Sequence, residues 1–434
     1  MSKNKTDNDF DLIIIGGGLA GASLACALQN VSVDDGLNNG RLKIAVVEAF
    51  SLNTDLQPSY DDRTVALSYG SRCIFDSMGA GQGLWSSLAP YAEAINTIHI
   101  SDRGHFGVTR LTKEQEGVAA LGYVLENRSI GQQLYKVMTA GSDADAAISA
   151  TDNITLFCPA ELSGLQQEKD KVSVEILVKG KAQTLSASLL VAADGNNSQV
   201  MQLLAIGSSR KDYHQVALIC NVTPGKKHNN VAYERFTESG PLAFLPMQHN
   251  RCSVVWTLDP QQADYLYALD DADFLQQLQQ RFGYRLGQLK KVGARQCYPL
   301  FLQSAAQMVH DRVAVIGNAA HSVHPVAGQG FNLALRDVAL LSELIVDCRR
   351  AGQDIGAPVM LQNYASLRED DVKRVYRFTD ALVKTFSNAI PAVAHLRSLS
   401  LLVVDVVPDI KHQLATQSMG LGGHLSRLNR GLPL

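Results

Sequence analysis

Near its N-terminus the chain carries an uncharged stretch, "LIIIGGGLAGASLACAL", that runs from Leu12 to Leu28. The first part of this stretch is a β-branched run, which is typical of a buried parallel strand. Glycines follow at once, and the Ala/Leu-rich remainder favours a helix. A membrane helix or a secretory signal explains the stretch less well, because glycine is a poor helix former and because Asp7, Asp9 and Asp11 come just before it. The pattern predicts a strand, a tight turn and a helix.

The glycines of this turn have the spacing of a dinucleotide-binding motif, G-x-G-x-x-G. In such motifs the glycines permit the tight turn, the approach of the backbone to a pyrophosphate, and close packing of helix on strand. The helix N-terminus then faces the phosphates with free N–H groups. A second strand, "RLKIAVVEA", ends in an acidic residue suited to a ribose; the polar insert "VSVDDGLNNGR" places it later than the usual distance of about 20 residues. The predicted dinucleotide site comprises Gly16, Gly17, Gly18, Leu19, Ala20, Gly21 and Glu48.

Two later stretches repeat the pattern of a strand followed by a turn. "LLVAADGNNS" is an apolar strand that ends at Asp194-Gly195, and a second strand over 312–316 leads into a Gly317-Asn318 turn. A loop with a proline and glycines follows, and the chain is predicted to be helical from Phe331. Together the three stretches resemble the three-motif pattern of the class A flavoprotein monooxygenases, the relatives of para-hydroxybenzoate hydroxylase.

Further stretches narrow the resemblance to the FAD-dependent hydroxylases of ubiquinone biosynthesis. "HPVAGQGFNLALRD" looks like the signature of that group, and "DDRTVALS", "ISDRGHFG", "YERFTESGPLAFLPM" and "RCSVVW" extend the similarity from about residue 11 to about Thr385. "SDRGH" and "ERFTESGPLAFLPM" look most like members that hydroxylate a 2-polyprenyl-6-methoxyphenol para to its hydroxyl. A sister hydroxylase that acts at another ring position is the alternative.

The resemblance implies that NAD(P)H reduces bound FAD and that the reduced flavin traps O₂ as a C4a-hydroperoxide, which an electron-rich phenol attacks. The flavin carries the chemistry, while the protein supplies placement, electrostatics and exclusion of water. Amides at a helix start over 328–332 would stabilise the negative charge of reduced flavin. The resemblance also implies that the following residues bind the cofactor: Arg63, Arg128, Gln132, Asp194, Gly195, Gly317, Asn318, Pro325, Gly328, Gln329, Gly330, Phe331 and Asn332.

The sequence departs from the family pattern at two positions. Asn318 stands where the family has an aspartate that binds the ribityl chain; the amide keeps the hydrogen-bonding capacity but loses the charge. Met201 stands where an arginine is common, which leaves the docking position of NAD(P)H open. Arg63, taken without the resemblance, equally suits a surface arginine paired with Asp61 or Asp62.

The predicted fold class is α/β, with a Rossmann-like FAD-binding domain of the para-hydroxybenzoate hydroxylase type. This domain is expected to be discontinuous, over 1–80, 115–205 and 295–350. Short alternating runs such as "VALICNV" and "CSVVWTL" predict an antiparallel β-sheet substrate domain over 81–114 and 206–294, followed by a C-terminal helical region over 351–434. A pocket for a greasy ring is expected to include Phe236, Leu242, Phe244 and Trp256, although core packing explains each of them equally well.

His321 and His324 have the spacing H-x-x-H, which invites a metal interpretation. The pair lacks an acidic partner and a third ligand, so we expect no metal. His324, beside Pro325, is instead expected on the substrate side of the flavin. There it could hydrogen-bond a phenol oxygen and act as a base.

The composition of the chain limits the kinds of partner that we expect the protein to bind. A net charge of -3 gives no reason to expect nucleic acid, and seven scattered cysteines are typical of reduced thiols in a cytoplasmic protein. The apolar run "AVAHLRSLSLLVVDVV" suits a core, a homo-oligomer interface or a membrane surface. Because a polyprenyl substrate lives in the bilayer, peripheral membrane contact or association with a biosynthetic complex is a further hypothesis.

Other function classes fit the sequence less well. A flavin-dependent halogenase needs a WxWxIP motif, whereas Trp85 and Trp256 stand alone. A prenyl reductase of the same superfamily would not consume O₂. A non-enzymatic flavin-binding scaffold is the alternative from another class, and Asn318 and Met201 slightly favour it.

Overall fold

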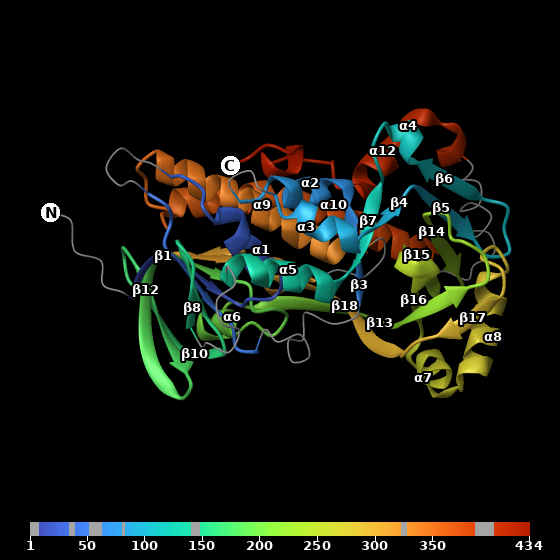
Figure 1. The fold of residues 1–434 in the computed structure, drawn as a ribbon, viewed down its shortest axis with the longest axis horizontal. Coiled ribbons are helices and arrows are strands. Elements are labelled where there is room, and N and C mark those ends of the chain that lie inside the picture. The colour runs from blue at the N-terminus through green and yellow to red at the C-terminus, as the bar shows by residue number, and fades with distance from the viewer. Residues whose placement is uncertain are drawn as a thin grey trace.

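The computed structural model describes residues 8–33, 40–51, 63–79, 83–139, 148–322, 328–386 and 403–434. The fold is α/β, as the sequence predicts, with two large sheets at opposite ends of an elongated molecule (Figure 1). His324, Pro325, Asp61, Asp62 and most of the apolar C-terminal run lie outside the described residues.

The first sheet has the predicted N-terminal strand at its centre. Strand β1 (Asp9–Ile15) pairs in parallel with β2 (Ile44–Val47) on one side and with β12 (Lys181–Ala192) on the other. Strand β9 (Ile154–Phe157) extends the parallel pairing beyond β2, and β20 (Val313–Val315) extends it beyond β12. Antiparallel strands complete the sheet: β8 (Ile148–Ala150), β10 (Ala160–Gln167), β11 (Val172–Val178) and β19 (Val309–His310). Distant stretches of chain thus meet in one sheet.

Both faces of β1 are buried. Leu12 and Ile14 pack into a core with helix α1 (Leu19–Leu28), which itself lies against α5 (Asn127–Thr139) and α9 (Gln329–Arg350). Ile13 and Ile15 pack into a second core on the opposite face of the sheet. A strand covered on both faces needs apolar residues at every position, which explains the continuous apolar run in the sequence.

The second sheet is almost entirely antiparallel. Its strands run in the order β21 (His321–Ser322), β18 (Gln296–Ala305), β13 (Ser208–Pro224), β16 (Arg251–Leu258), β15 (Gly240–Met247), β14 (Val231–Thr237), β5 (Thr97–Asp102) and β6 (Val108–Thr112), and β17 (Leu289–Val292) also pairs with β13. Only β14 and β5 pair in parallel among these described strands. Helices α7 (Pro260–Ala268) and α8 (Asp271–Phe282) cover one face. A small third sheet, β3 (Thr64–Ser68), β7 (Gly122–Glu126) and β4 (Glu93–Ile95), lies between the two large ones (Figure 1).

One predicted boundary differs from the sheet pairing. Strands β18 and β21 fall within the range 295–350 that the sequence assigns to the FAD-binding domain, yet both belong to the second sheet. The reason is the length of β13, which pairs with β18 from Ser208 to Ile219 and holds it in that sheet. Sequence periodicity within β18 carries no information about this partner.

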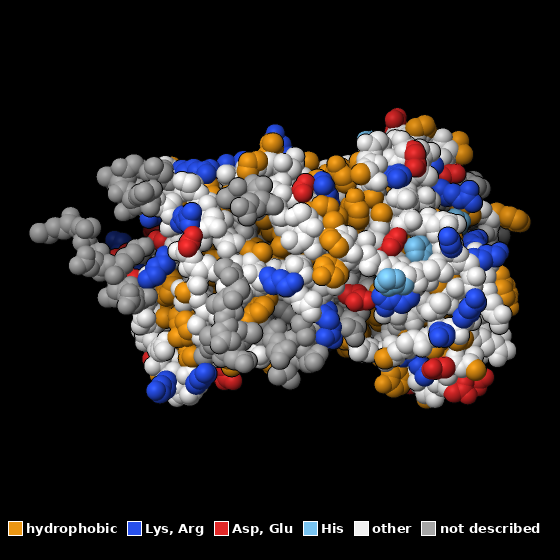
Figure 2. All heavy atoms as spheres, in the orientation of Figure 1, with side chains coloured by type: hydrophobic (Ala, Val, Ile, Leu, Met, Phe, Trp, Pro, Cys, Tyr) orange, Lys and Arg blue, Asp and Glu red, His pale blue; other side chains and the backbone are white. Residues whose placement is uncertain are grey.

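The remaining helices surround the sheets. They are α2 (Tyr69–Ser77), α3 (Trp85–Leu88), α4 (Lys113–Glu116), α6 (Gln199–Leu203), α10 (Pro358–Phe386) and α12 (Pro408–Ser418), with short 3₁₀ turns η1 (Ala89–Tyr91), η2 (Gln248–Asn250), η3 (Gly317–Ala319) and η5 (Leu428–Arg430). The described part of the C-terminal region is helical, as expected. No helix among the described residues is long and apolar enough to cross a membrane. Positive and negative side chains are interspersed over the face shown in Figure 2, in keeping with the small net charge.

Candidate functional site

The glycine turn after β1 has no room for side chains. Gly16 has a φ of +101°, and a Cβ there would lie 2.5 Å from the Ala193 carbonyl oxygen. A Cβ on Gly21 would lie 1.9 Å from the carbonyl oxygen of Gly16. Helix α1 begins after Gly18 without a side-chain cap, so its first N–H groups are available to an anion. The turn is thus packed against the protein's own backbone and forms a glycine cradle, whose free N–H groups at the start of α1 suit an anion such as a phosphate.

Glu48, the residue after β2, is hydrogen-bonded to this turn. Its Oε2 accepts a hydrogen bond from the Gly17 amide at 2.6 Å, and its Oε1 accepts one from the Phe50 amide at 2.8 Å. The residue is 5% exposed and lines the cavity described below. The predicted acidic residue therefore lies beside the glycine motif.

A cavity of about 1020 Å³ runs along the three stretches that the sequence singles out. The predicted cofactor residues that line it are Gly16, Gly18, Leu19, Ala20, Glu48, Arg63, Asp194, Gly195, Asn318, Gly328, Gly330, Phe331 and Asn332. Gly17, Gly21, Gly317 and Gln329 are not lining residues; they belong to the turns and helix starts that shape the wall. Arg128 and Gln132 lie half-buried on α5, whose first residue, Asn127, does line the cavity. The cofactor roles of all these residues stay predictions.

Asp194 lines this cavity and has one carboxylate oxygen without a hydrogen bond to any described residue. Its Oδ2 accepts hydrogen bonds from the amides of Gln199 (2.7 Å) and Val200 (3.2 Å), whereas its buried Oδ1 has no partner among the described residues. Burial raises the pKa of Asp194, and hydrogen bonding to the Ser198 side chain and to nearby backbone amides offsets the effect only in part. A buried acceptor without a partner is uncommon in proteins. Together with the glycine cradle it fits a ligand rich in hydroxyl groups and phosphates, such as FAD.

Asn332 serves the protein's own structure. Its Oδ1 accepts hydrogen bonds from the Ser68 amide (2.8 Å) and the Ser71 hydroxyl (2.7 Å). Its Nδ2 donates to the carbonyl oxygens of Ala66 (2.9 Å) and Gly328 (2.7 Å). The side chain thus fixes the start of α9 against β3 and α2. What this helix start offers a ligand is its backbone N–H groups.

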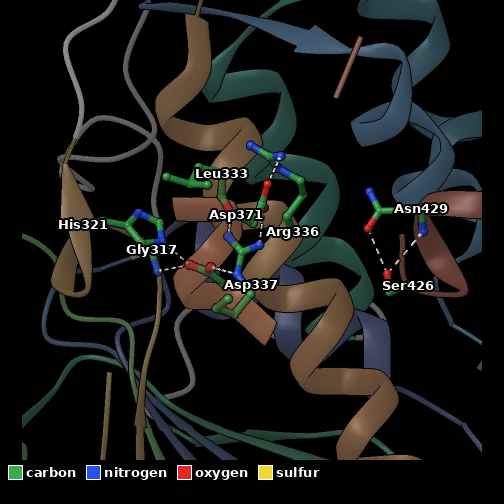
Figure 3. A network of polar contacts seen from close by, with 9 residues as sticks. Gly317, His321, Leu333, Arg336, Asp337, Asp371, Ser426 and Asn429 are labelled. Carbon is green, nitrogen blue, oxygen red and sulfur yellow. Dashed lines mark hydrogen bonds and ion pairs between the residues drawn. The ribbon is translucent and has the colours of Figure 1, made fainter. Parts of the chain in front are cut away.

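A buried polar network lies behind the Gly317-Asn318 turn (Figure 3). Asp337 on α9 accepts a hydrogen bond from the Gly317 amide at 2.9 Å, and it lies 2.7 Å from both His321 Nε2 and Arg368 Nε. Arg368 also pairs with Asp371, which accepts from Arg336 at 2.8 Å. The sequence reasoning missed this network, although the acidic residue of "LALRD" within an apolar helix is a signal. His321, weighed above as a metal ligand, is instead a partner of Asp337.

Burial by itself would raise the pKa of Asp337. Electrostatic interactions with His321 and Arg368, and hydrogen bonds from His321 and Gly317, outweigh that effect and hold the pKa of Asp337 below its usual value. Asp337 is therefore an anion that holds the Gly317 turn in place.

The second sheet forms the apolar part of the cavity wall, and here the prediction needs correction. Phe236 lines the cavity, and its role toward a substrate stays a prediction. Leu242, Phe244 and Trp256 do not; they are buried in the core beneath α7 and α8. Successive side chains of a strand point to opposite faces, so the neighbours Ala243, Leu245 and Val255 face the cavity in their place. Further apolar lining comes from Ile95, Ile98, Ile100, Ile219, Val404 and Leu414.

The structure also shows where Arg63 and Met201 lie. Arg63 lines the cavity, with its guanidinium 5.0 Å from the centre of the Tyr298 ring. Met201, which replaces a family arginine, is buried on α6 in the core of the first sheet. The replacement thus suits an apolar environment.

The chain was compared with known proteins. A family model described as "FAD binding domain" matches residues 9–379. The chain is 36% identical to ubiquinone hydroxylase UbiL of Rhodospirillum rubrum, over 99% of this chain and 94% of that protein. It is 29% identical to 3-demethoxyubiquinol 3-hydroxylase of Escherichia coli, over 96% of this chain and 100% of that protein.

Solved structures share the fold. p-Nitrophenol 4-monooxygenase PnpA of Pseudomonas putida has a TM-score of 0.75 at 16% identity, covering 96% of this chain and 99% of that one. PqsL of Pseudomonas aeruginosa has a TM-score of 0.71 at 19% identity, covering 91% and 100%. The resemblance stated from sequence motifs is confirmed, and the chain belongs to the FAD binding domain family as an FAD-dependent aromatic monooxygenase of the ubiquinone hydroxylase group.

Proposed function

We propose that this enzyme acts in ubiquinone biosynthesis and hydroxylates a 2-polyprenyl-6-methoxyphenol para to its hydroxyl, with NAD(P)H and O₂ as co-substrates. The names of the relatives support the pathway, and the stretches "SDRGH" and "ERFTESGPLAFLPM" support the ring position. A sister reaction at another ring position is the second candidate, because one relative is named as a 3-hydroxylase.

The observation that carries the proposal is the two-part character of one cavity. One part has glycine turns, the Asp194 carboxylate and the start of α9; the other is walled by the apolar face of the second sheet. A cofactor with phosphates and hydroxyls suits the first part, and a greasy substituted ring suits the second. The wall residues Val404 and Leu414 extend the apolar part toward the C-terminal segment, which leaves apolar surface for a prenyl chain.

FAD, when bound, supplies the redox chemistry by taking a hydride from NAD(P)H and activating O₂ toward an electron-rich ring. The chain's own residues bind and orient the reactants. Gly16 and Gly18 line the cavity where phosphates would lie, and the Asp194 carboxylate can accept hydrogen bonds from ligand hydroxyls. The first amides of α9, from Gln329 onward, would hold negative charge at the helix start. The apolar wall excludes water from the place where the ring would lie.

Peripheral membrane contact is part of the proposal. Next to the cavity-lining Val404, the side chains of Val403, Val406 and Ile410 are 43%, 76% and 42% exposed. An apolar outer surface beside an apolar inner wall suits a substrate that arrives from a bilayer. Association with a biosynthetic complex or a second copy of the chain stays a prediction.

The deciding experiment is a lipid analysis of cells that lack the gene and any second hydroxylase able to compensate for it. Loss of quinone with accumulation of the prenyl-methoxyphenol supports para-hydroxylation. Accumulation of a prenylphenol without the methoxy group assigns the sister reaction instead. Unchanged quinone contradicts the pathway.

A further inference from the structure

One carboxyl group interrupts the apolar wall that the second sheet gives to the cavity. Glu234 on β14 has Ile100 of β5 and Ala243 of β15 as its register partners. Ala243 pairs with Val255 on β16, and Val255 pairs with Ile219 on β13. All five residues line the cavity. A row across five strands therefore presents four apolar side chains and a single acid to the same space.

The Glu234 carboxyl has no hydrogen bond or ion pair with any described residue, and burial raises its pKa to about 7. The other ionisable side chains that line the described part of the cavity are Glu48, Arg63, Asp194 and Tyr233. None of these is a cause of the Glu234 shift. Glu234 is half-buried, since it faces the cavity. An acid that is partly withdrawn from water usually has a partner, because the loss of hydration is costly. An isolated acid beside the small side chain of Ala243 leaves room for a partner that enters with the substrate.

We propose that Glu234 accepts the hydrogen bond of the substrate's phenol hydroxyl and takes its proton, so that the ring reacts as a phenolate. The inference rests on the proposed function, since it needs a phenol in the apolar part of the cavity. A phenol has a pKa of about 10 in water, and a base that titrates near the working pH is the most effective proton acceptor. Glu234 meets that condition, and it lies on the wall where the ring would pack.

In this proposal one proton moves from the phenol to Glu234 and returns at the end of the reaction. The phenol O–H bond breaks, an O–H bond forms on a Glu234 carboxylate oxygen, and the electron pair stays on the phenolate oxygen. That oxygen donates into the ring and enriches the para carbon, which gains a hydroxyl group made of one atom of O₂ and a solvent proton. The other atom of O₂ becomes water with the hydride of NAD(P)H and the proton that the para carbon loses. When the para carbon loses its proton and the ring becomes aromatic again, the phenolate oxygen recovers the proton held by Glu234. The residue ends the cycle unchanged.

The test compares Glu234→Gln and Glu234→Asp with the wild-type holoenzyme, using 2-geranyl-6-methoxyphenol as the probe. Product formation is measured by mass spectrometry at a series of pH values from 5.5 to about 9, a range that spans the raised pKa. Glu161→Gln is the matched control, because Glu161 is an exposed acid on β10 of the other sheet. FAD content and circular dichroism show whether each variant folds.

We expect the wild-type rate to rise with pH through about 7, because the carboxylate form is the base. Glu234→Gln should lose that limb of the profile and about 10² to 10⁴ in rate, the usual contribution of a general base. Glu234→Asp should keep the limb at a reduced rate, and Glu161→Gln should match the wild type. A Gln variant with wild-type rate and pH profile overturns the proposal. An inactive wild type contradicts the proposed function itself, which is a separate result.

Discussion

The Oδ2 atom of Asp337, on the third turn of α9, accepts a hydrogen bond from the Gly317 amide at 2.9 Å. Gly317 begins the turn after β20, and its neighbour Asn318 lines the cavity. Helix α9, whose first residues line the candidate flavin site, thus also holds the Gly317-Asn318 turn, which lines another part of the same site. Arg368 and His321 keep the bonding oxygens of Asp337 in place.

Asp337→Asn should destabilise the fold by about 3 to 5 kcal/mol, because it removes one partner from a buried ionic network and leaves the Arg368 charge poorly compensated. Urea unfolding measures the change. Asp347→Asn is the control on the same helix: Asp347 is 52% exposed and pairs with Arg427, so its loss should cost about 0 to 1 kcal/mol. Similar losses in the two variants would contradict the role given to the buried network.

Low pH should destabilise the folded protein through protonation of Asp337. The pKa of Asp337 is lowered in the folded protein, so its contribution to stability is complete above the unfolded pKa of about 3.9 and is lost as the pH falls through the lower folded value. The thermal midpoint of the wild type should therefore drop more steeply below about pH 4 than that of Asp337→Asn. Scanning calorimetry from pH 3 to about 7 makes the comparison. Parallel curves would mean that Asp337 is not the group responsible.

The glycine cradle gives a sharper prediction for cofactor binding. Gly21→Ala would place a Cβ 1.9 Å from the Gly16 carbonyl oxygen, so the turn must move. We expect a loss of about 1 to 3 kcal/mol in stability and a purified protein with little FAD. Gly207→Ala is the matched control, since nothing lies within 4 Å of the added Cβ. Absorbance at the flavin bands measures the FAD content. Equal FAD content in both variants would contradict a role of the glycine turn in FAD binding.

Sequence alone predicts the elements whose signals are local. The strand, the glycine turn and Glu48 follow from residues close together in the chain, and the pairing of β1 with β2 agrees with them. The network around Asp337 is beyond such reasoning, because Arg368 comes from a helix whose packing against α9 no local pattern specifies. Likewise, the partners of β18 depend on the length of β13 rather than on its own residues.

The alternation of side chains along β14 and β15 determines which of their residues face the cavity. Phe236 and Glu234 are two residues apart on β14 and both line the cavity. The assignment of Phe236 to the pocket therefore already implied Glu234 by strand alternation. On β15 the bulky Leu242 and Phe244 were the residues that suggested a pocket wall. Bulk, however, does not determine which face of a strand is covered by α7 and α8. The small Ala243 faces the cavity because its neighbours fill the core.

This alternation can be tested with two adjacent residues. Ala243→Phe adds a ring on the cavity side and should raise the KM for 2-geranyl-6-methoxyphenol about tenfold or more, equivalent to about 1.4 kcal/mol of lost binding, with FAD content unchanged. Leu242→Ala deletes a fully buried side chain from the opposite core and should cost about 2 to 5 kcal/mol in unfolding free energy, with KM unchanged. Steady-state kinetics and urea unfolding, both run on each variant, separate the two effects. If Leu242→Ala raised KM while Ala243→Phe left it unchanged, the cavity-facing side of β15 would have to be reassigned, and with it the wall on which Glu234 lies.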